Sequence, residues 1–337
     1  MLLGNCTGEE DQLTNGSDTG LHEVEQVLVP IFDTLILVLG VGGHTMVMVI
    51  LCGRQRRGPP QSSMTGTGTD VLLLALSSAD LMLLSVLPFH TVAIAMQQWP
   101  FGDFMCRLVS FLGSACSSAS VFTLGTLAVS RYLTVVQPAR AYSLLSHRRV
   151  SIAAALLWVP ACCLATPQLV FRSVRSPHRA PDSLACFAFL SHRDQLIYGL
   201  FHFLVAFLFP LVTIAVAYGR IYMFLWRSQH GGRAPQVERY QSKVTRTSAM
   251  LVLTFTLCWL PSYGLTLALL VDESLGATGS SPRYGPFSVF ARLMATSSTV
   301  INPILYVLMS QKFRQDLLGL FKRGGQTTSG TFAMAAA

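Results

Sequence analysis

The stretch SSTVINPILYVLM, residues 297–309, is an apolar segment near the C-terminus with an Asn-Pro pair at its centre. Proline removes a backbone donor and clashes with the preceding turn, so Pro303 predicts a kinked helix. An asparagine in apolar surroundings is costly unless another buried group bonds it. Asn302 and Pro303 therefore predict a helix that needs a bend and a polar contact, and Tyr306 follows three residues later.

The composition of the chain places this helix in a membrane. The chain has 337 residues, 51% hydrophobic and only 12% charged, and its mean hydropathy is +0.50. Soluble globular proteins carry about 25% charged residues. Seven stretches reach the roughly 20 apolar residues that a spanning helix needs, namely residues 27–52, 71–96, 104–136, 150–170, 196–226, 248–271 and 287–309. They lack the alternation of transmembrane strands, so we expect an all-α membrane protein, a bundle of seven transmembrane helices.

The charges set the orientation of this bundle. No Lys or Arg precedes Arg54, and most of the 24 basic residues lie in alternate loops or after the last span. The positive-inside rule makes that side cytoplasmic. The net charge of +8 therefore reflects membrane topology, and a nucleic-acid patch is the weaker explanation. The N-terminal tail is then extracellular; it carries glycosylation sequons at Asn5 and Asn15 and shows no cleavable signal peptide.

Several ionisable or kink-forming residues lie within the spans, where such groups are expensive and usually functional. Asp80, in LALSSAD, lies near the middle of the second span, and a buried acid satisfied by nearby hydroxyls is its plainer explanation. Arg131, in SRY, ends the third span, where a long side chain can reach water. CWLPSY, residues 258–263, adds a proline kink to the sixth span. Each of these signals is weak by itself.

The eight cysteines do not have the spacing of a metal site. Cys106 and Cys186 lie on the outer side, where a disulfide can persist. Five others lie within spans, where cysteine is more simply a small hydrophobic residue. Cys6 is left over in the N-terminal tail.

Together these features resemble the rhodopsin-like (class A) G-protein-coupled receptors. LALSSAD, SRY, CWLP and NPILY occur in that family's order and spacing, and the resemblance covers roughly residues 27–323. WPFG at residues 99–102 matches as well, and KFR at 312–314 resembles the start of an amphipathic helix after the seventh span. The resemblance implies four regions: an extracellular glycosylated tail (1–26), the bundle (27–310), an amphipathic membrane-surface helix (311–323) and a short cytoplasmic tail (324–337).

The resemblance also implies roles for particular residues. A disulfide would join Cys106 to Cys186. A sodium ion, the only cofactor expected, would bind Asp80, Ser120, Ser298 and Asn302 in the inactive state, because their oxygen atoms suit a hard cation. Switching and G-protein coupling would depend on Ser130, Arg131, Tyr132, Tyr218, Trp259, Pro261, Asn302, Pro303 and Tyr306.

Two positions depart from the family pattern. His44 replaces an asparagine in the first span, which puts the packing of the first two spans in doubt. Ser130 replaces the acidic residue that usually precedes Arg131 and so removes the nearest restraint on the guanidinium. Both departures make normal coupling an open question.

The class of ligand is also implied by resemblance. Gly113 stands where amine receptors carry an aspartate, and Thr296 stands where opsins carry the retinal-binding lysine, so neither class fits. Pro88 and the long polar loop at 172–193 are similar to those of peptide receptors, most closely the galanin, kisspeptin and allatostatin types. The expected ligand pocket contains His90, Gly113, His202, Tyr263, Thr266 and Arg292. Arg292 would pair with a carboxylate of the ligand or, alternatively, with Asp272 or Glu273.

The expected protein is thus a multi-pass plasma-membrane receptor for a neuropeptide or peptide hormone that activates a heterotrimeric G protein. Arrestin and membrane lipid are further expected partners. A lipid or other small ligand, a decoy receptor and a proton-coupled transporter are the alternatives, although the transporter lacks an internal repeat. No enzyme is expected: HRD at 192–194 lacks a glycine-rich strand, and GVGG at 40–43 lies inside a span, where it would serve packing.

Overall fold

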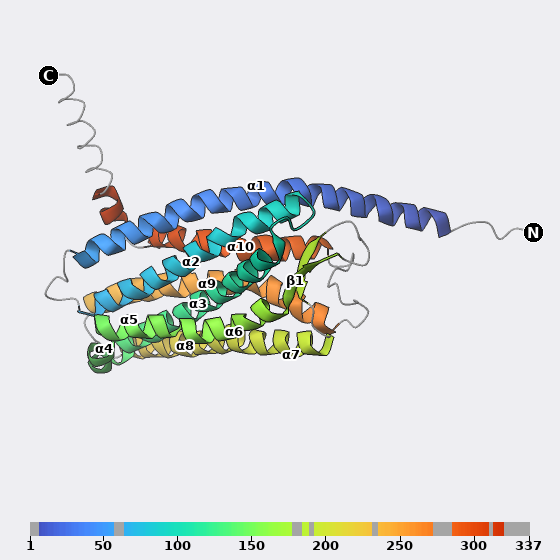
Figure 1. Ribbon diagram of the computed structural model, residues 1–337. Helices are drawn as coiled ribbons and strands as arrows, with labels where there is room; N and C mark the ends of the chain where they lie inside the picture. The colour runs from blue at the N-terminus through green and yellow to red at the C-terminus, as the bar shows by residue number, and fades with distance from the viewer. Residues whose placement is uncertain are drawn as a thin grey trace, which may run out of the picture.

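The computed structural model describes residues 7–56, 64–176, 184–188, 192–230, 235–271, 285–309 and 313–319. Its long helices run side by side along one axis (Figure 1). The elements are α1 (Thr7–Arg56), α2 (Met64–Ala95), α3 (Gly102–Val136), α4 (Pro138–Leu144), α5 (His147–Leu156), α6 (Trp158–Phe171), β1 (Arg172–Arg175), β2 (Ala185–Ala188), α7 (His192–Phe203), the π-helix η1 (Leu204–Leu208), α8 (Phe209–His230), α9 (Pro235–Val271) and α10 (Gly285–Met309). Residues 313–319 form a further short helix.

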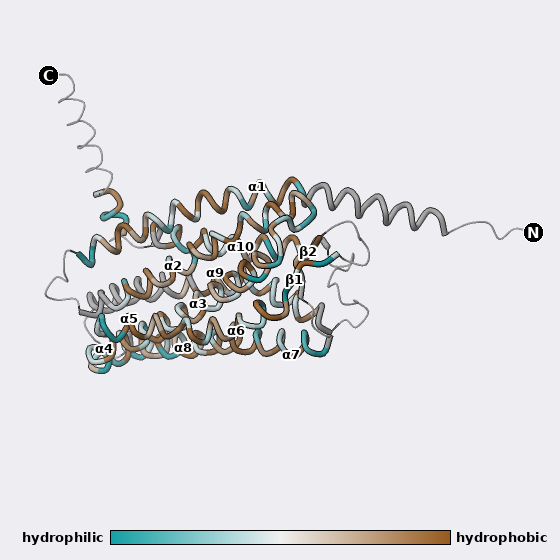
Figure 2. The backbone as a smooth tube through the Cα atoms, in the orientation of Figure 1, coloured by the Kyte–Doolittle hydropathy of each residue, from teal (hydrophilic) through white to brown (hydrophobic). Residues whose placement is uncertain are grey.

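All seven predicted spans lie in helices of this bundle, so the predicted all-α fold is confirmed. By length and composition, five segments of the described chain can each cross a membrane, namely Gln26–Arg56, Gly68–Ala95, Gly102–Val136, His147–Phe171 and Arg193–Ser228. A shorter apolar segment, Val252–Ala268, lies in α9. Figure 2 shows hydrophobic residues along the whole length of the bundle.

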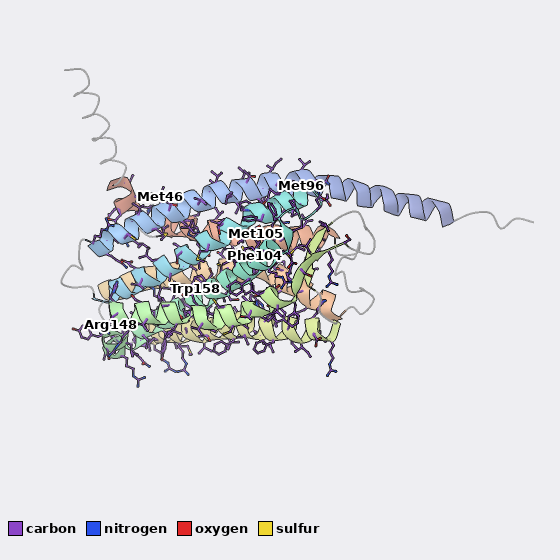
Figure 3. All side chains as sticks on the ribbon, in the orientation of Figure 1. Met46, Met96, Phe104, Met105, Arg148 and Trp158 are labelled. Carbon is purple, nitrogen blue, oxygen red and sulfur yellow. A yellow bond between two sulfur atoms is a disulfide. The ribbon has the colours of Figure 1, made fainter. Side chains whose placement is uncertain are left out.

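The outer surface of the bundle is apolar as well as its interior. Leu35, Val38 and Leu39 on α1 are 56%, 64% and 59% exposed. A soluble protein rarely exposes such a continuous apolar surface, whereas lipid is a suitable surrounding for it. Figure 3 shows Arg148 at the α4 end of the bundle and Met96 toward the other end, which agrees with a basic cytoplasmic side.

Two prolines interrupt helices that the sequence predicts as continuous. Pro160 has no N–H to bond the carbonyl of Leu156, and α5 ends at Leu156. Pro210 likewise cannot bond the carbonyl of Ala206, which lies inside η1. The chain widens locally to a π-helix there, as often happens at functional sites. The fourth span is therefore divided between α5 and α6, and the fifth between α7, η1 and α8.

α1 begins earlier than the apolar run that predicts it. The helix starts at Thr7, and its N-terminal end projects beyond the other helices (Figure 1). The tail boundary expected at residue 26 is therefore not a helix boundary. Asn15 falls on α1, and Asn5 lies outside the described residues.

A small hairpin that the sequence analysis missed lies at the outer end. β1 and β2 pair antiparallel, with Val174 opposite Cys186. The predicted disulfide is confirmed: Cys186 is bonded to Cys106 near the start of α3, with 5.7 Å between the Cα atoms. The Asp103 carboxylate also accepts a hydrogen bond from the backbone N–H of Val174 at 3.0 Å. The hairpin is therefore fastened to α3 by two separate contacts.

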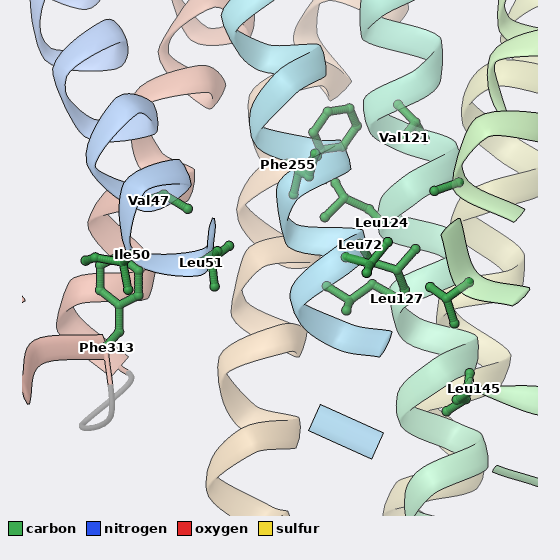
Figure 4. Packing of buried hydrophobic residues seen from close by; sticks show 14 of the residues in the cluster. Val47, Ile50, Leu51, Leu72, Val121, Leu124, Leu127, Leu145, Phe255 and Phe313 are labelled. Atoms are coloured by element: carbon green, nitrogen blue, oxygen red, sulfur yellow. The ribbon is translucent and has the colours of Figure 1, made fainter. Parts of the chain in front are cut away.

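The largest apolar cluster lies toward the α4 end of the bundle and joins α1, α2, α3, α4, α5, α9 and the last helix. Figure 4 shows Phe313 of the last helix beside Ile50 of α1, and Phe255 of α9 beside Leu124 of α3. These four side chains are 4%, 4%, 7% and 0% exposed. The short last helix is therefore part of the core, and the buried ring of Phe313 packs it against the bundle.

Close packing explains the GVGG stretch of α1. A Cβ added at Gly43 would lie 2.8 Å from Cγ of Pro303, and one added at Gly40 would lie 2.7 Å from a methyl group of Leu84. Both distances are shorter than van der Waals contact, so a larger residue at Gly43 would press against the rigid ring of Pro303, and one at Gly40 would displace the Leu84 side chain. Small residues commonly allow membrane helices to approach in this way.

Candidate functional site

A cavity of about 740 Å³ lies between the outer halves of α2, α3, α6, α7, α9 and α10. All six residues that the sequence analysis assigned to a ligand pocket line it: His90, Gly113, His202, Tyr263, Thr266 and Arg292. A Cβ added at Gly113 would meet no atom within 4 Å, so this glycine faces open space. Volume and lining are typical of a ligand-binding cavity.

Aromatic rings lead from this pocket toward the core. The rings of His202 and Tyr263 stack with their centroids 6.3 Å apart, and Tyr263 lies 4.5 Å from the ring of Phe207 in η1. Tyr263 is 6.1 Å from Trp259, which stacks on Phe255 at 5.6 Å. A ligand that moves Tyr263 must therefore disturb a column of rings along α9.

Arg292 has a partner that the sequence analysis did not consider. Its Nη2 donates a hydrogen bond to Oδ2 of Asp33 in α1 at 2.6 Å, and Thr91 donates to the same oxygen at 3.0 Å. The Asp33 side chain is 0% exposed, whereas that of Arg292 is 28% exposed. Asp272 and Glu273, the alternatives in the sequence analysis, lie outside the described residues. Asp33 lies within the first span, and an acidic residue in a span is itself a signal of function that could have identified it from the sequence.

A second arginine in the pocket wall, Arg172 at the start of β1, was also missed. Its Nε donates to Oε1 of Gln168 at 2.8 Å, and its Nη1 donates to the carbonyl of Cys186 at 3.5 Å. Burial lowers the pKa of Arg172 from its ordinary value, and the nearby Tyr198 opposes this shift. The cavity therefore contains a second guanidinium, which is half-buried.

Beneath the pocket, a polar centre forms around Asp80, which is 2% exposed. Ser120 donates to Oδ1 of Asp80 at 2.8 Å, and Nδ2 of Asn302 donates to Oδ2 at 2.7 Å. Asp80 is thus the polar contact that the Asn-Pro pair predicted. The carboxylate, hydroxyl and amide oxygens at this centre are ligands that suit a hard cation such as Na⁺.

His44 contacts this centre, whereas Ser298, an expected sodium ligand, bonds to other groups. His44, fully buried, places Nε2 3.5 Å from Oδ2 of Asp80 and 2.7 Å from the carbonyl of Thr299. The imidazole thus bridges α1, α2 and α10, which answers the doubt about their packing. Ser298 points elsewhere: its Oγ donates to the carbonyl of Ala295 at 2.7 Å and accepts from Nε1 of Trp259 at 3.1 Å. Ser298 therefore joins the ring column to α10.

The C-terminal part of α3 and the middle of α8 carry residues that the sequence analysis expects to contact a G protein. Ser130 is 2% exposed, and its Oγ has no hydrogen-bond partner among the described residues. Tyr132 accepts a hydrogen bond from Gln137 at 3.0 Å. Tyr132 and Tyr218 pack on one apolar cluster with residues of α3, α8 and α9. Arg131 is half-buried, and the side chain of Tyr306 lies outside the described residues.

A group of ion pairs that the sequence analysis did not predict lies at the same end of the bundle. Nε of Arg54 in α1 donates to Oδ2 of Asp316 in the last helix at 2.6 Å. Nη1 of Arg54 lies 3.6 Å from Oδ1 of Asp70 in α2. One arginine thus ties two transmembrane helices to the short helix that follows the bundle.

Comparisons with known proteins agree with this geometry. The model of the family "7 transmembrane receptor (rhodopsin family)" matches residues 45–306. The allatostatin-A receptor of Bombyx mori is 29% identical over 316 residues, which cover 93% of this chain and 83% of that protein. Galanin receptor type 2 of Mus musculus is 28% identical over 335 residues, 98% of this chain and 86% of the relative. Somatostatin receptor type 4 of Rattus norvegicus is 29% identical over 311 residues, 91% and 75% of the two chains.

Proposed function

Because the chain belongs to the rhodopsin family of seven-transmembrane receptors, we propose that it binds an extracellular peptide and activates a heterotrimeric G protein. The family is one of multi-pass plasma-membrane proteins, and in this proposal the N-terminus and the pocket mouth face outward. The observation that carries the proposal is the large pocket below the disulfide-bonded hairpin. The relatives named for allatostatin, galanin and somatostatin support a peptide as the ligand.

The ring column gives this proposal a mechanism. A ligand that contacts Tyr263 biases the position of α9, because the rings of Tyr263, Trp259 and Phe255 follow one another along it. Pro261 lies inside α9 and provides a bend about which its cytoplasmic half can swing. The ligand favours the open arrangement only by binding it more tightly than the closed one. The opened end then accepts a helix of the Gα subunit, a helix-in-groove contact near Arg131 and Tyr218, and arrestin would use the same opening.

The test is a screen of synthetic peptide pools on cells that express the receptor, with G-protein nucleotide exchange as the readout. We expect at least one pool to raise exchange above that of cells without the receptor. Gly113→Phe should abolish that response at normal surface expression, because its ring would project into the pocket and occupy space that the ligand needs. Gly264→Phe is the matched control: Gly264 is exposed and does not line the pocket. A full response in Gly113→Phe would exclude this pocket as the peptide site.

The same cells separate the alternative functions. If the cells respond to a lipid or another small molecule and to no peptide, the protein is still a receptor, but its ligand is not a peptide. Peptide binding with no nucleotide exchange would indicate a decoy receptor. Proton-dependent uptake that depends on Asp80, His44, His90 and His202 would indicate a transporter. We propose no enzymatic activity.

We further propose that the centre around Asp80 binds sodium and that sodium stabilises the inactive state. Raising sodium should then lower ligand-free nucleotide exchange in the native receptor, and Asp80→Asn should lose this dependence because the carboxylate supplies the negative charge. The control is His44→Asn, which removes the imidazole but leaves the oxygen ligands, and it should keep the dependence. Equal sodium sensitivity in the native and Asp80→Asn receptors would exclude Asp80 as the ion's ligand.

Ser130 is expected to raise signalling without ligand. A carboxylate at residue 130 could hold Arg131 by a charge-assisted hydrogen bond, which is roughly twice as strong as a neutral one. Ser130→Asp should therefore lower basal nucleotide exchange by about 5- to 10-fold, which corresponds to about 1 kcal/mol. Ser130→Asn, of the same shape without the charge, should change it little. Unchanged basal exchange in Ser130→Asp, at matched surface expression, would show that the missing carboxylate does not set the resting equilibrium.

A further inference from the structure

The Asp, Glu, Lys and Arg side chains that line the pocket in the described part of the chain are all cationic. Two arginines, Arg172 and Arg292, line the cavity, and no Asp or Glu occurs among the lining residues that the structure describes. Arg292 is neutralised from behind by Asp33, whose Oδ2 it contacts at 2.6 Å. Its charge is therefore already balanced within the protein, before any ligand enters.

Arg172 differs from Arg292 in this respect. Its hydrogen bonds to described residues reach an amide oxygen of Gln168 and the backbone carbonyl of Cys186, and both acceptors are neutral. None of the ion pairs formed within the described chain includes Arg172. A charge removed from water is costly until an opposite charge meets it. An anion that enters the pocket would supply that charge.

The guanidinium of Arg172 is also held in place. Gln168, which accepts from its Nε, donates its own N–H to the hydroxyl of Tyr198 at 3.1 Å. Tyr198 in turn donates to the carbonyl of Leu164 at 3.0 Å. On the other side, Cys186 is fixed to α3 by the disulfide. Arg172 is thus preorganised between α6, α7 and β2, which reduces the entropy lost when a ligand binds.

We propose that Arg172 is the anion-binding residue of this pocket and that the ligand presents a carboxylate to it. The inference rests on the proposed function and adds the charge of the ligand group that meets the pocket wall at the start of β1. Arginine binds a carboxylate through two parallel N–H···O bonds, a stronger and more directional contact than lysine makes. The carboxylate can be the C-terminus of a peptide or an Asp or Glu side chain, since both offer the same two oxygens.

The first test does not depend on signalling. Thermal stability of the purified receptor is measured with 10 mM of three small probes: N-acetyl-phenylalanine, its amide, and N-acetyl-glutamic acid α-amide. A bound probe raises the melting temperature. We expect stabilisation by one or both acids and none by the amide, with the first acid representing a peptide terminus and the second a side chain. Arg172→Gln should lose the effect, and Arg172→Lys should retain part of it. Arg175→Gln, on the same strand but outside the pocket lining, should behave as the native receptor does.

Equal shifts with acid and amide, no shift with either acid, or an undiminished acid effect in Arg172→Gln would overturn the proposal. The second test uses peptide pools in matched versions, with free-acid or amidated C-termini and with or without Asp and Glu. Pools with neither acid should be inactive, and Arg172→Gln should weaken the response to the others on the order of 10- to 100-fold. Activation by the fully neutral pool would leave the peptide receptor standing and refute the role of Arg172. Acid probes that stabilise through Arg172 while every pool fails would support the anion site and refute the peptide as activator.

Discussion

Arg292→Gln is expected to destabilise the receptor much more than Asp33→Asn. The two substitutions break the same ion pair, but they leave different groups behind. Without Arg292, the carboxylate of Asp33 stays at 0% exposure with no cation beside it, and an uncompensated buried charge costs about 3–5 kcal/mol. Without Asp33, the guanidinium is 28% exposed in the pocket wall and can be hydrated there, so we expect a loss of about 1–2 kcal/mol.

The measurement is the midpoint of thermal inactivation for the purified single variants and for the double variant Asp33→Asn/Arg292→Gln. The double variant should be more stable than Arg292→Gln alone, because the buried charge is removed with its partner. Thr91→Val is a useful comparison, since it removes only the hydroxyl that donates to Asp33. Equal losses from Asp33→Asn and Arg292→Gln would show that the burial of Asp33 does not govern the energetics of this pair.

Removal of the Cys106–Cys186 disulfide is expected to produce the other large effect. The bond joins residues 80 apart in sequence, and loss of such a bond typically costs about 2–5 kcal/mol, with long loops at the higher end. Release of β2 would also free the carbonyl of Cys186, which accepts a hydrogen bond from Arg172. Cys106→Ser and Cys186→Ser should therefore reduce both surface expression and peptide response.

The control for the disulfide is Cys163→Ser, because Cys163 is an exposed free cysteine of α6. It should express and respond as the native receptor does. Mass spectrometry of unreduced peptides should recover residues 106 and 186 in one linked product. A Cys106→Ser receptor with native thermal stability and native response would show that the contact between Val174 and Asp103 is sufficient to hold the hairpin.

The spans and the Asp80–Asn302 contact could be predicted because each depends on local chemistry. A run of about 20 apolar residues has few options other than a membrane helix. An asparagine beside a proline in such a run needs a buried partner, and Asp80 is a polar group near the middle of another span. The residues of the pocket could be assigned by resemblance because their positions within the spans, counted from the motifs, place them in the outer half.

The pairing of Asp33 with Arg292 could not be predicted, since 259 residues separate them in sequence. Their meeting depends on how α1 and α10 are rotated about their axes, and that rotation is set by packing at Gly43 and Pro303 rather than by hydrophobicity. The hairpin was missed because its strands are four residues each and polar in part. Arg172 was missed for the same reason. From sequence alone, an arginine in a loop is expected to lie in solvent, and only the folded loop places it in the wall of a cavity.

The contact between Gly43 and Pro303 means that the end of α10 can bend only about a point where α10 rests against α1. The proline ring lies against a bare stretch of α1 backbone, so the kink has a fixed support on one side. From Pro303 to Met309 the helix forms a lever roughly 9 Å long at about 1.5 Å per residue. A bend of about 20° at the proline would therefore move the end of α10 by only about 3 Å. This lever limits how far the end of α10 can move, and a side chain added at Gly43 would shift the support and change that limit.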